Sequence, residues 1–212
     1  MEEKRKILNI YHILSKEYPQ AHIRLNYSSP FELLVSAILA GQSSEDKVNP
    51  VTEELFNKYP SINELSKASP EDIEEIIKST SVYKGKAQSI ISISKMLIRE
   101  YNNKFPDTVE KLTEFPGVGQ RTAKLVLANC FYYPAILVDS YFKRVAKRVG
   151  ITKGDTPDEI EADLMAKLDE NKWTRFSLTM AEHGRDICLP KSPKCLECKL
   201  FNLCEYAGHQ KI

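Results

Sequence analysis

Apolar residues near the start of the chain recur at the three- and four-residue spacing of an amphipathic helix. Ile7, Ile10, Tyr11 and Leu14 fall on one helical face, and further sets with the same period follow along the chain. No strand-like alternation persists, although residues 135–138 form a short apolar run that can be extended. The pattern therefore predicts an all-α protein.

Polar residues mark where several of these helices begin. Ser29 and Thr156 each precede a proline and are followed three residues later by Glu32 and Glu159. This is the arrangement of a capping box with a first-turn proline. Related starts occur at Ser61, Ser69 and Asp107. Glycine and proline fall between the predicted helices, as expected for the turns that separate them.

Length and composition predict an ordinary globular protein. A chain of 212 residues is long enough for one large domain or two small ones. The N-terminus is charged and no long apolar run follows it, which argues against a secretory signal. No apolar stretch approaches the length of a membrane span. We expect a soluble, cytoplasmic protein, associated with the nucleoid if the source is bacterial.

The charge balance leaves two interpretations open. A net charge of +1 does not by itself indicate a nucleic-acid-binding protein. The basic residues are nevertheless clustered, and if they converge in space they form a surface for nucleic acid. Otherwise they are solvated helix faces. The clusters are Lys84 and Lys86; Arg121 and Lys124; Lys143, Arg144, Lys147 and Arg148; and Lys191 and Lys194.

Four of the five cysteines lie near the C-terminus with the spacing C-x6-C-x2-C-x5-C: Cys188, Cys195, Cys198 and Cys204. In a chain without an export signal, this density favours a metal centre over disulfides. Four thiolates suit either a tetrahedral zinc ion or a [4Fe–4S] cluster, and the spacing alone leaves both open. Cys130 lies in an apolar helical segment and is expected in the core.

The cysteine spacing, together with its place in the chain, resembles the iron–sulfur loop of the endonuclease III family of DNA glycosylases. The resemblance implies a [4Fe–4S] cluster held by the four cysteines, with a structural role and no part in bond cleavage. It also implies that the loop between the first two ligands presents Lys191 and Lys194 to a DNA phosphate.

A second motif carries the same resemblance. Residues 115–123, FPGVGQRTA, place two glycines just before a helix start. Such a turn is either a plain helix connection or an anion site at a helix N-terminus. It resembles the family's helix-hairpin-helix motif, which implies DNA contacts at Gly117, Val118, Gly119 and Arg121.

Further along, residues 136–140 resemble the stretch that supplies the family's catalytic aspartate, here Asp139. An aspartate at a helix start is also a common N-cap. Residues 26–34 and 183–185 extend the resemblance over nearly the whole chain. By position, Gln42 resembles the glutamine that fills the gap left by an extruded nucleotide, and Val82 the apolar wedge. A surface glutamine and an ordinary turn valine are the plainer alternatives. Lys84 is expected to contact DNA beside them.

The resemblance implies a base-excision-repair glycosylase. Such an enzyme flips a nucleotide out of the duplex and cleaves the bond between base and sugar, which builds positive charge on the sugar. Asp139 is the candidate carboxylate that stabilises this charge and activates water. Bifunctional members add a lysine nucleophile at the position of Arg121, and arginine cannot be deprotonated. Tyr141 replaces a histidine common in the family. Both replacements favour a monofunctional glycosylase.

Several alternatives remain at this point. Lys124 lies one turn after Arg121 and is a possible substitute amine in a bifunctional glycosylase/AP lyase acting on oxidised pyrimidines. Mismatched thymine or uracil, or an alkylated base, are open as substrates. An adenine glycosylase is not expected, since its catalytic glutamate position is Ala37. A catalytically silent DNA-structure binder and a redox sensor are non-enzymatic alternatives, although Asp139 argues against the first.

The resemblance also implies an architecture of two helical domains. Residues 23–134 are expected to form a domain with the helix-hairpin-helix, and residues 1–22 with 135–212 the domain of the iron–sulfur cluster. We expect a monomer that binds double-stranded DNA, containing a damaged or mismatched base, in the cleft between the domains.

Overall fold

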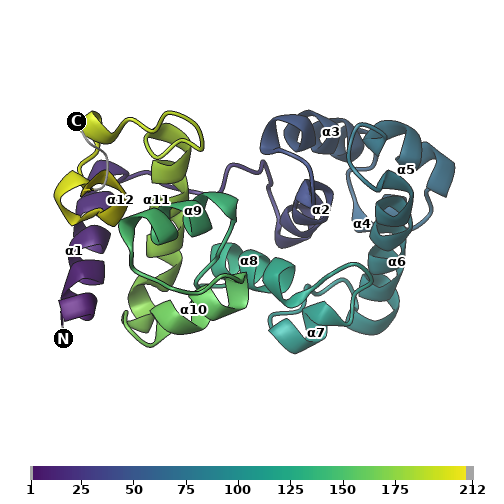
Figure 1. Ribbon diagram of the computed structural model, residues 1–212. Helices are drawn as coiled ribbons and strands as arrows, with labels where there is room; N and C mark the ends of the chain where they lie inside the picture. Colours follow the sequence, from purple (N-terminus) through teal and green to yellow (C-terminus); the bar gives the residue numbers. More distant parts are fainter. Residues whose placement is uncertain (1, 209–212) are drawn as a thin grey trace. The chain divides into compact units, whose positions relative to one another are not determined.

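The computed structural model describes residues 2–208, and the regular elements within them are all helices (Figure 1). The prediction of an all-α protein is confirmed. The α-helices are α1 (Glu2–Glu17), α2 (Pro30–Ala40), α3 (Glu45–Lys58), α4 (Ile62–Leu65), α5 (Pro70–Ile77), α6 (Tyr83–Tyr101), α7 (Val109–Thr113), α8 (Gln120–Cys130), α9 (Ser140–Val149), α10 (Pro157–Met165), α11 (Trp173–Asp186) and α12 (Glu205–Gly208). Three short 3-10 helices are η1 (Glu170–Lys172), η2 (Cys195–Glu197) and η3 (Phe201–Leu203).

The chain divides into two compact units. Unit 1 combines Met1–Ile23 with Pro134–Ile212, and unit 2 is Arg24–Tyr133. Each unit has its own apolar core, described next. That the two units are separate domains stays a prediction.

Unit 2 is built around α2, α6 and α8. Helix α2 packs against α3, α6 and α8; α4 and α5 pack on α6, and α7 packs on α8. The apolar faces of these helices meet in a closed core, whose fully buried members include Leu33, Leu34, Leu39, Leu55, Ile73, Ile77, Ile90, Leu97 and Leu127. Burial of each such side chain stabilises the unit by about 1.5–3 kcal/mol. The hairpin between α7 and α8, the loop after α2 and the loop before α6 all adjoin helices of this core, which fixes their ends.

Unit 1 is centred on α11, which packs against α1 and α9. The predicted apolar face of α1 is buried here, and the core members include Ile7, Ile10, Leu14, Phe142, Val145, Ile160, Leu164, Phe176 and Met180. Residues 134–139 have no regular secondary structure and lead from α8 into α9.

Helix starts follow the predicted caps closely, with two differences. The hydroxyls of Ser29, Ser61, Ser69 and Thr156 accept backbone N–H groups of the first turn, and Thr156 forms a complete capping box with Glu159. Glu32 instead accepts the N–H and hydroxyl of Ser28, one residue before the cap. The helix predicted to start at Asp107 is capped by Thr108. Both residues carry a suitable acceptor, but the donor is the Lys111 N–H, which lies three residues after Thr108.

No helix among the described residues is long and apolar enough to cross a membrane.

Candidate catalytic, DNA-binding and cluster sites

Asp139 stands at the junction of an extended segment and a helix. The segment that precedes it is fixed to α11: the Ala135 N–H donates to Thr174 Oγ1 at 3.3 Å and the Leu137 N–H to Ser177 Oγ at 2.8 Å. Asp139 is then the N-cap of α9, with Oδ1 accepting the Phe142 N–H at 2.6 Å. The carboxylate is half-buried and held in one orientation by its own helix.

The hairpin between α7 and α8 is shaped by its first glycine. Gly117 has φ +79°, and a Cβ there would lie 2.9 Å from Ser89 Oγ. The Val118 N–H donates to the Phe115 carbonyl at 3.1 Å and closes the turn. Gly119 is the N-cap of α8 and has no side chain to accept a first-turn N–H. The main-chain donors at this helix start therefore suit an anion.

The side chains around the hairpin differ in access. Val118 is only 6% exposed and belongs to the buried core, so it offers little surface to a ligand. Arg121 is exposed in the first turn of α8, and Lys124, one turn later, is half-buried. Cys130, at the end of the same helix, is half-buried as well, so the prediction that it lies in the core was only partly right.

Gln42 and Val82 come from loops that are joined to each other. Ser81 donates its hydroxyl to the Gln42 carbonyl at 2.8 Å, and its N–H to Ser43 Oγ at 3.1 Å. Gln42 has φ 63° and Val82 φ 55°, a region that a β-branched residue rarely occupies. Both side chains are exposed, Val82 to 69%. Lys84 is exposed in the first turn of α6.

The four C-terminal cysteines line one pocket. Cys188, Cys195, Cys198 and Cys204 surround it, together with apolar and basic side chains that include Val149, Ile187 and Arg148. All four are free thiols. The loop between the first two is closed by the Lys194 N–H, which donates to the Ile187 carbonyl at 3.0 Å. Lys191 and Lys194 are both exposed on it.

The environment of Cys198 and Cys204 disfavours the anionic form of these two thiols in the protein alone. Burial, together with the neighbouring thiols of Cys204, Cys188 and Cys195, raises the pKa of the Cys198 thiol to about 11. Burial also raises the pKa of Cys204. A bound metal centre supplies the positive charge that reverses such shifts, because metals bind the thiolate.

The pocket of the four cysteines is not arranged as a ready donor set for a single metal ion, and the other described residues offer none. Within residues 2–208, no group of three or more His, Cys, Asp or Glu side chains is arranged to hold a metal ion.

Helix α9 joins Asp139 to the cysteine loop. Arg144 donates to the carbonyls of Cys188 (2.8 Å) and Gly184 (2.6 Å). Arg148 donates to Cys188 Sγ at 3.4 Å and to the Leu189 carbonyl at 2.6 Å. Both guanidinium groups thus hold the start of the loop that carries the lysines.

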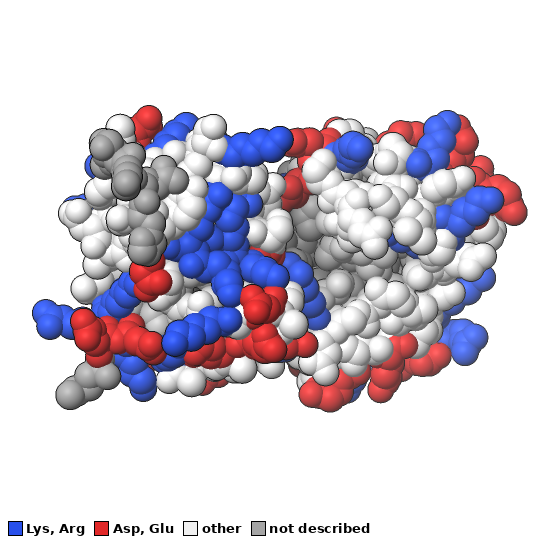
Figure 2. Space-filling model, in the orientation of Figure 1, with Lys and Arg blue, Asp and Glu red and all other residues white. Residues whose placement is uncertain are grey.

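The two lysines of α9, Lys143 and Lys147, are bonded to Asp155 in the loop before α10 and not to the cysteine loop. Lys143 Nζ donates to the Asp155 carbonyl at 2.5 Å, and Lys147 Nζ lies 2.8 Å from Asp155 Oδ1. Figure 2 shows Lys and Arg side chains gathered on the face of unit 1 where Figure 1 places α9. The cluster predicted from sequence is therefore a real basic surface, but its cations also brace the adjoining loops.

Tyr141 is clamped two residues after Asp139. The Arg185 guanidinium lies 4.5 Å from the ring centroid and that of Arg144 5.4 Å from it. Gly184 lets the ring approach α11, since a Cβ there would come within 2.8 Å of the Tyr141 Cβ. Tyr141 thereby couples the first turn of α9 to α11.

Comparisons with known proteins agree with this geometry. Residues 35–170 match the model of the HhH-GPD superfamily base excision DNA repair protein. The chain belongs to this superfamily. Endonuclease III of Synechocystis sp. is 38% identical over 97% of this chain and 94% of its own, and that of Thermotoga maritima is 38% identical over 90% and 88%. A solved structure described as a trapped endonuclease III–DNA covalent intermediate is 35% identical, with a TM-score of 0.90, and covers 97% of each chain.

The family assignment confirms several predictions for this HhH-GPD protein. The resemblance to endonuclease III is confirmed by relatives that cover most of the chain. The enzyme class is confirmed as well: the chain is a DNA N-glycosylase of base excision repair.

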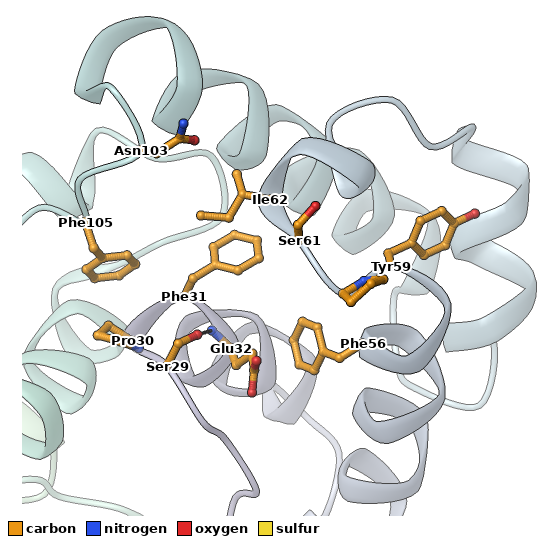
Figure 3. Close-up of a pocket in the computed structure, with 11 residues that line it drawn as sticks. Ser29, Pro30, Phe31, Glu32, Phe56, Tyr59, Ser61, Ile62, Asn103 and Phe105 are labelled. Atoms are coloured by element: carbon orange, nitrogen blue, oxygen red, sulfur yellow. Dashed lines mark hydrogen bonds between the residues drawn. The ribbon is translucent and has the colours of Figure 1, made fainter.

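One pocket of the HhH-GPD protein was not predicted from sequence. In unit 2, a cavity of about 320 Å³ is lined by aromatic side chains, among them Phe31, Phe56 and Phe105 (Figure 3). It contains none of the predicted site residues. No sequence motif marks the position of Phe56 or Phe105.

Sequence reasoning also missed residues that support the sites. Lys86 was noted only as a member of a basic cluster, and Arg144 and Arg148 only as surface charge. Their partners are main-chain carbonyls that lie far away in sequence. No local spacing encodes such bonds, so only the fold reveals them.

Proposed function

We propose that this protein removes a damaged or mismatched base from double-stranded DNA by hydrolysis, as a monomer and without a lyase step. The observation that carries the proposal is Arg121. It lies in the first turn of α8, directly after the hairpin, at the position where the family resemblance puts the lysine nucleophile. A guanidinium keeps its proton under all physiological conditions and cannot form a Schiff base.

The chain's own residues would share the work as follows. The hairpin and the start of α8 bind a phosphate through main-chain N–H groups, with Arg121 as a fixed cation beside it. Gln42 and Val82 enter the space of the flipped nucleotide. Lys84, Lys191 and Lys194 contact the DNA backbone.

Asp139 is the proposed catalytic residue. Its carboxylate stabilises the positive charge that develops on the sugar as the bond between C1′ and the base nitrogen breaks. It also orients a water molecule, whose oxygen forms the new bond to C1′. The proton lost by water balances the one taken up by the departing base, so the products are a free base and an abasic site.

The four C-terminal cysteines are proposed to hold a [4Fe–4S] cluster. Support comes from the way they line one pocket and from the name shared by the relatives. The donor set fits, because such clusters are bound by four cysteine thiolates. The cluster would fix the loop that carries Lys191 and Lys194, while the residues described above perform the chemistry.

A bifunctional glycosylase/AP lyase is the second candidate. It is favoured by the relatives named endonuclease III and by the solved covalent intermediate with DNA. Lys124 is the amine on this chain that would serve it, one turn beyond Arg121 on α8. Oxidised pyrimidines would then be the expected substrates.

Borohydride trapping separates the two candidates. The purified protein is incubated with duplexes that contain an oxidised pyrimidine, a G·T or G·U mismatch, or an alkylated base, with and without borohydride. We expect base release that leaves an intact strand until alkali is added, and no covalent complex. A complex that disappears in Lys124→Ala would establish the lyase instead. Release of no base from any duplex would contradict the glycosylase proposal itself.

Arg121→Lys is the matched variant for this experiment. We expect it to yield a borohydride-trapped complex, because it puts an amine at the start of α8 with little change in shape or charge. If neither the original protein nor Arg121→Lys is trapped, the site around residue 121 excludes Schiff-base chemistry for reasons beyond the missing amine.

A further inference from the structure

Lys86, near the start of α6, is bonded to both loops that carry Gln42 and Val82. Its Nζ donates to the carbonyl oxygens of Leu39 at 2.9 Å and Gly41 at 2.7 Å. Its main-chain N–H donates to the Val82 carbonyl at 3.3 Å. One residue is therefore bonded both to the chain just before Gln42 and to Val82 itself.

The bonds made by Lys86 Nζ satisfy the end of a helix. The last carbonyls of α2 have no partner within the helix and form its negative end. A half-buried ammonium group suits this place, and burial lowers the pKa of Lys86. Among the described residues no carboxylate forms a salt bridge with Lys86, so main-chain carbonyls are its partners. The ammonium group of Lys86 thus stabilises the loop after α2.

A second connection joins the same two loops. Ser81 bonds to the Gln42 carbonyl and to Ser43 Oγ, as described above. The loop after α2 and the loop before α6 are therefore joined by Ser81, which bonds to Gln42 and Ser43. Lys86 adds a second link, through its bonds to Leu39 and Gly41. The exposed residues on this support are Gln42 and Val82, both with positive φ. Backbone strain of this kind persists only where the surroundings impose it.

We propose that Lys86 is a positioning residue that holds Gln42 and Val82 as one rigid pair for insertion into the duplex. The proposal rests on the proposed function, since it gives the support for the two residues assigned to the gap left by the flipped nucleotide. Lys86 acts through its bonds to main-chain carbonyls and needs no contact with DNA.

The first test uses the protein without DNA. Lys86→Met keeps the length and apolar stem of the side chain and removes the ammonium group. Lys95→Met is the matched control, since Lys95 is exposed further along the same helix. We expect faster amide hydrogen exchange at residues 41–43 and 81–83 in Lys86→Met, with the core of α6 unchanged. Equal exchange in the two variants would overturn the proposal, whatever the substrate of the enzyme.

The second test measures insertion into DNA. Both variants are made in an Asp139→Asn background, and 2-aminopurine is placed opposite an abasic site to report the filling of the gap. We expect Lys86→Met to bind an intact duplex normally and the abasic duplex roughly tenfold more weakly, with loss of the fluorescence change. Lys86→Arg, which keeps the cation, should restore most of the signal. Normal abasic-site binding by Lys86→Met would contradict the proposal.

A coupling measurement separates positioning from general stability. In a Gln42→Ala/Val82→Ala background, Lys86→Met should add no further loss of abasic-site affinity, because its effect passes through those two side chains. An undiminished further loss would show that Lys86 acts elsewhere. If Lys86→Met does not fold, Ser81→Ala removes the hydroxyl bond to the Gln42 carbonyl while keeping the N–H bond to Ser43, and should show the same pattern in weaker form. If the unaltered protein does not distinguish abasic from intact duplexes, the proposed function fails, and the exchange experiment still decides the role of Lys86.

Discussion

Asp139 combines two tasks at a single position. Its Oδ1 accepts the Phe142 N–H and begins α9, while the proposed reaction uses the charge of the same carboxylate. The two tasks are compatible, because a carboxylate has two oxygens and about four acceptor positions. The cap bond and the attachment of the preceding segment to Ser177 also fix the direction of the group. Such preorganisation is what electrostatic stabilisation of a transition state requires.

Substitution of Asp139 separates these tasks. Asp139→Asn should lower the single-turnover rate of base release at least ~100-fold, because the stabilising charge is lost. Affinity for DNA should be equal or higher, since a negative charge near phosphates is removed. The melting temperature should hardly change, as asparagine caps helices as well as aspartate. Single-turnover kinetics, DNA titration and thermal unfolding check the three expectations.

Asp139→Ala is the control for the cap. It should lose activity to the same extent and in addition lower the free energy of unfolding by about 1 kcal/mol. Near-normal rates in Asp139→Asn would mean that another group supplies the charge.

At the residue scale, the sequence names candidate positions but says little about their surroundings. The family resemblance placed Asp139, Arg121 and Gln42 by motif alone. The bonds of Lys86 to α2 and the clamp on Tyr141 join residues that are distant in sequence. Hydrophobic periods and cap motifs describe neighbours along the chain, so they carry no information about such partners.

At the scale of elements, several helices end on a cation from another helix. Arg175 of α11 donates to the Tyr18 carbonyl just beyond α1, and Lys6 of α1 donates to the Val149 carbonyl at the end of α9. Lys86 does the same for α2. These bonds satisfy carbonyls that lack intrahelical partners and oppose the helix dipole. Several helix starts, in contrast, are closed locally by the hydroxyl of a serine or threonine.

This contrast explains which element boundaries could be predicted. An N-cap lies within three residues of its donor, and Ser29, Ser61 and Ser69 were therefore found from sequence. The choice between Asp107 and Thr108 was ambiguous, since both can cap and they are adjacent. Helix ends that depend on a distant lysine or arginine have no such signature.

The end of α8 allows a direct test of backbone strain. Tyr132 has φ 55° and is 98% exposed. A residue other than glycine in this conformation costs about 1–2 kcal/mol, while glycine loses about 0.5–1 kcal/mol of chain entropy on folding. Tyr132→Gly should thus raise the free energy of unfolding by up to about 1 kcal/mol, measured by urea denaturation.

Tyr133→Gly is the control for the adjacent position. Tyr133 does not have a positive φ, so glycine there brings the entropy loss without relief of strain. It should lower the stability. Destabilisation by Tyr132→Gly as well would show that the exposed ring makes contacts that outweigh the strain.

At the scale of the whole molecule, the cysteine loop is tied to the core of unit 1. Cys188, Cys198 and Cys204 pack against that core, and the Cys204 thiol donates to the Arg148 carbonyl at 3.3 Å. Loss of the proposed cluster should therefore affect unit 1 before unit 2. This expectation follows if the two units are separate domains with separate cores.

Cys198→Ser tests both the cluster and the division into domains. The unaltered protein should be brown and contain about four irons per chain, and the variant should lose most of this iron. Amide exchange should become faster in α9, α11 and the cysteine loop, with the core of unit 2 still protected. A colourless protein with one zinc ion would contradict the cluster. Equal loss of protection in both units would contradict separate domains.

The large-scale features that the sequence could reveal are those written in local spacing. The four cysteines, the hairpin glycines and the helical period predicted the fold class and the candidate sites. The bonds that the α9 cations of the basic surface also make to the adjoining loops could not be predicted. A count of lysines and arginines does not distinguish a cation that braces a loop from one that attracts a phosphate.

The strained pair Gln42 and Val82 has a consequence for protein engineering. Glycine is the residue that both backbone conformations favour, so a redesign guided by stability alone would select it at these positions. The resulting protein should be as stable or more stable, and yet lack the side chains proposed to recognise an empty space in the duplex. Thermal screening of variants would then enrich inactive enzymes, a trade-off between stability and activity confined to two adjoining loops.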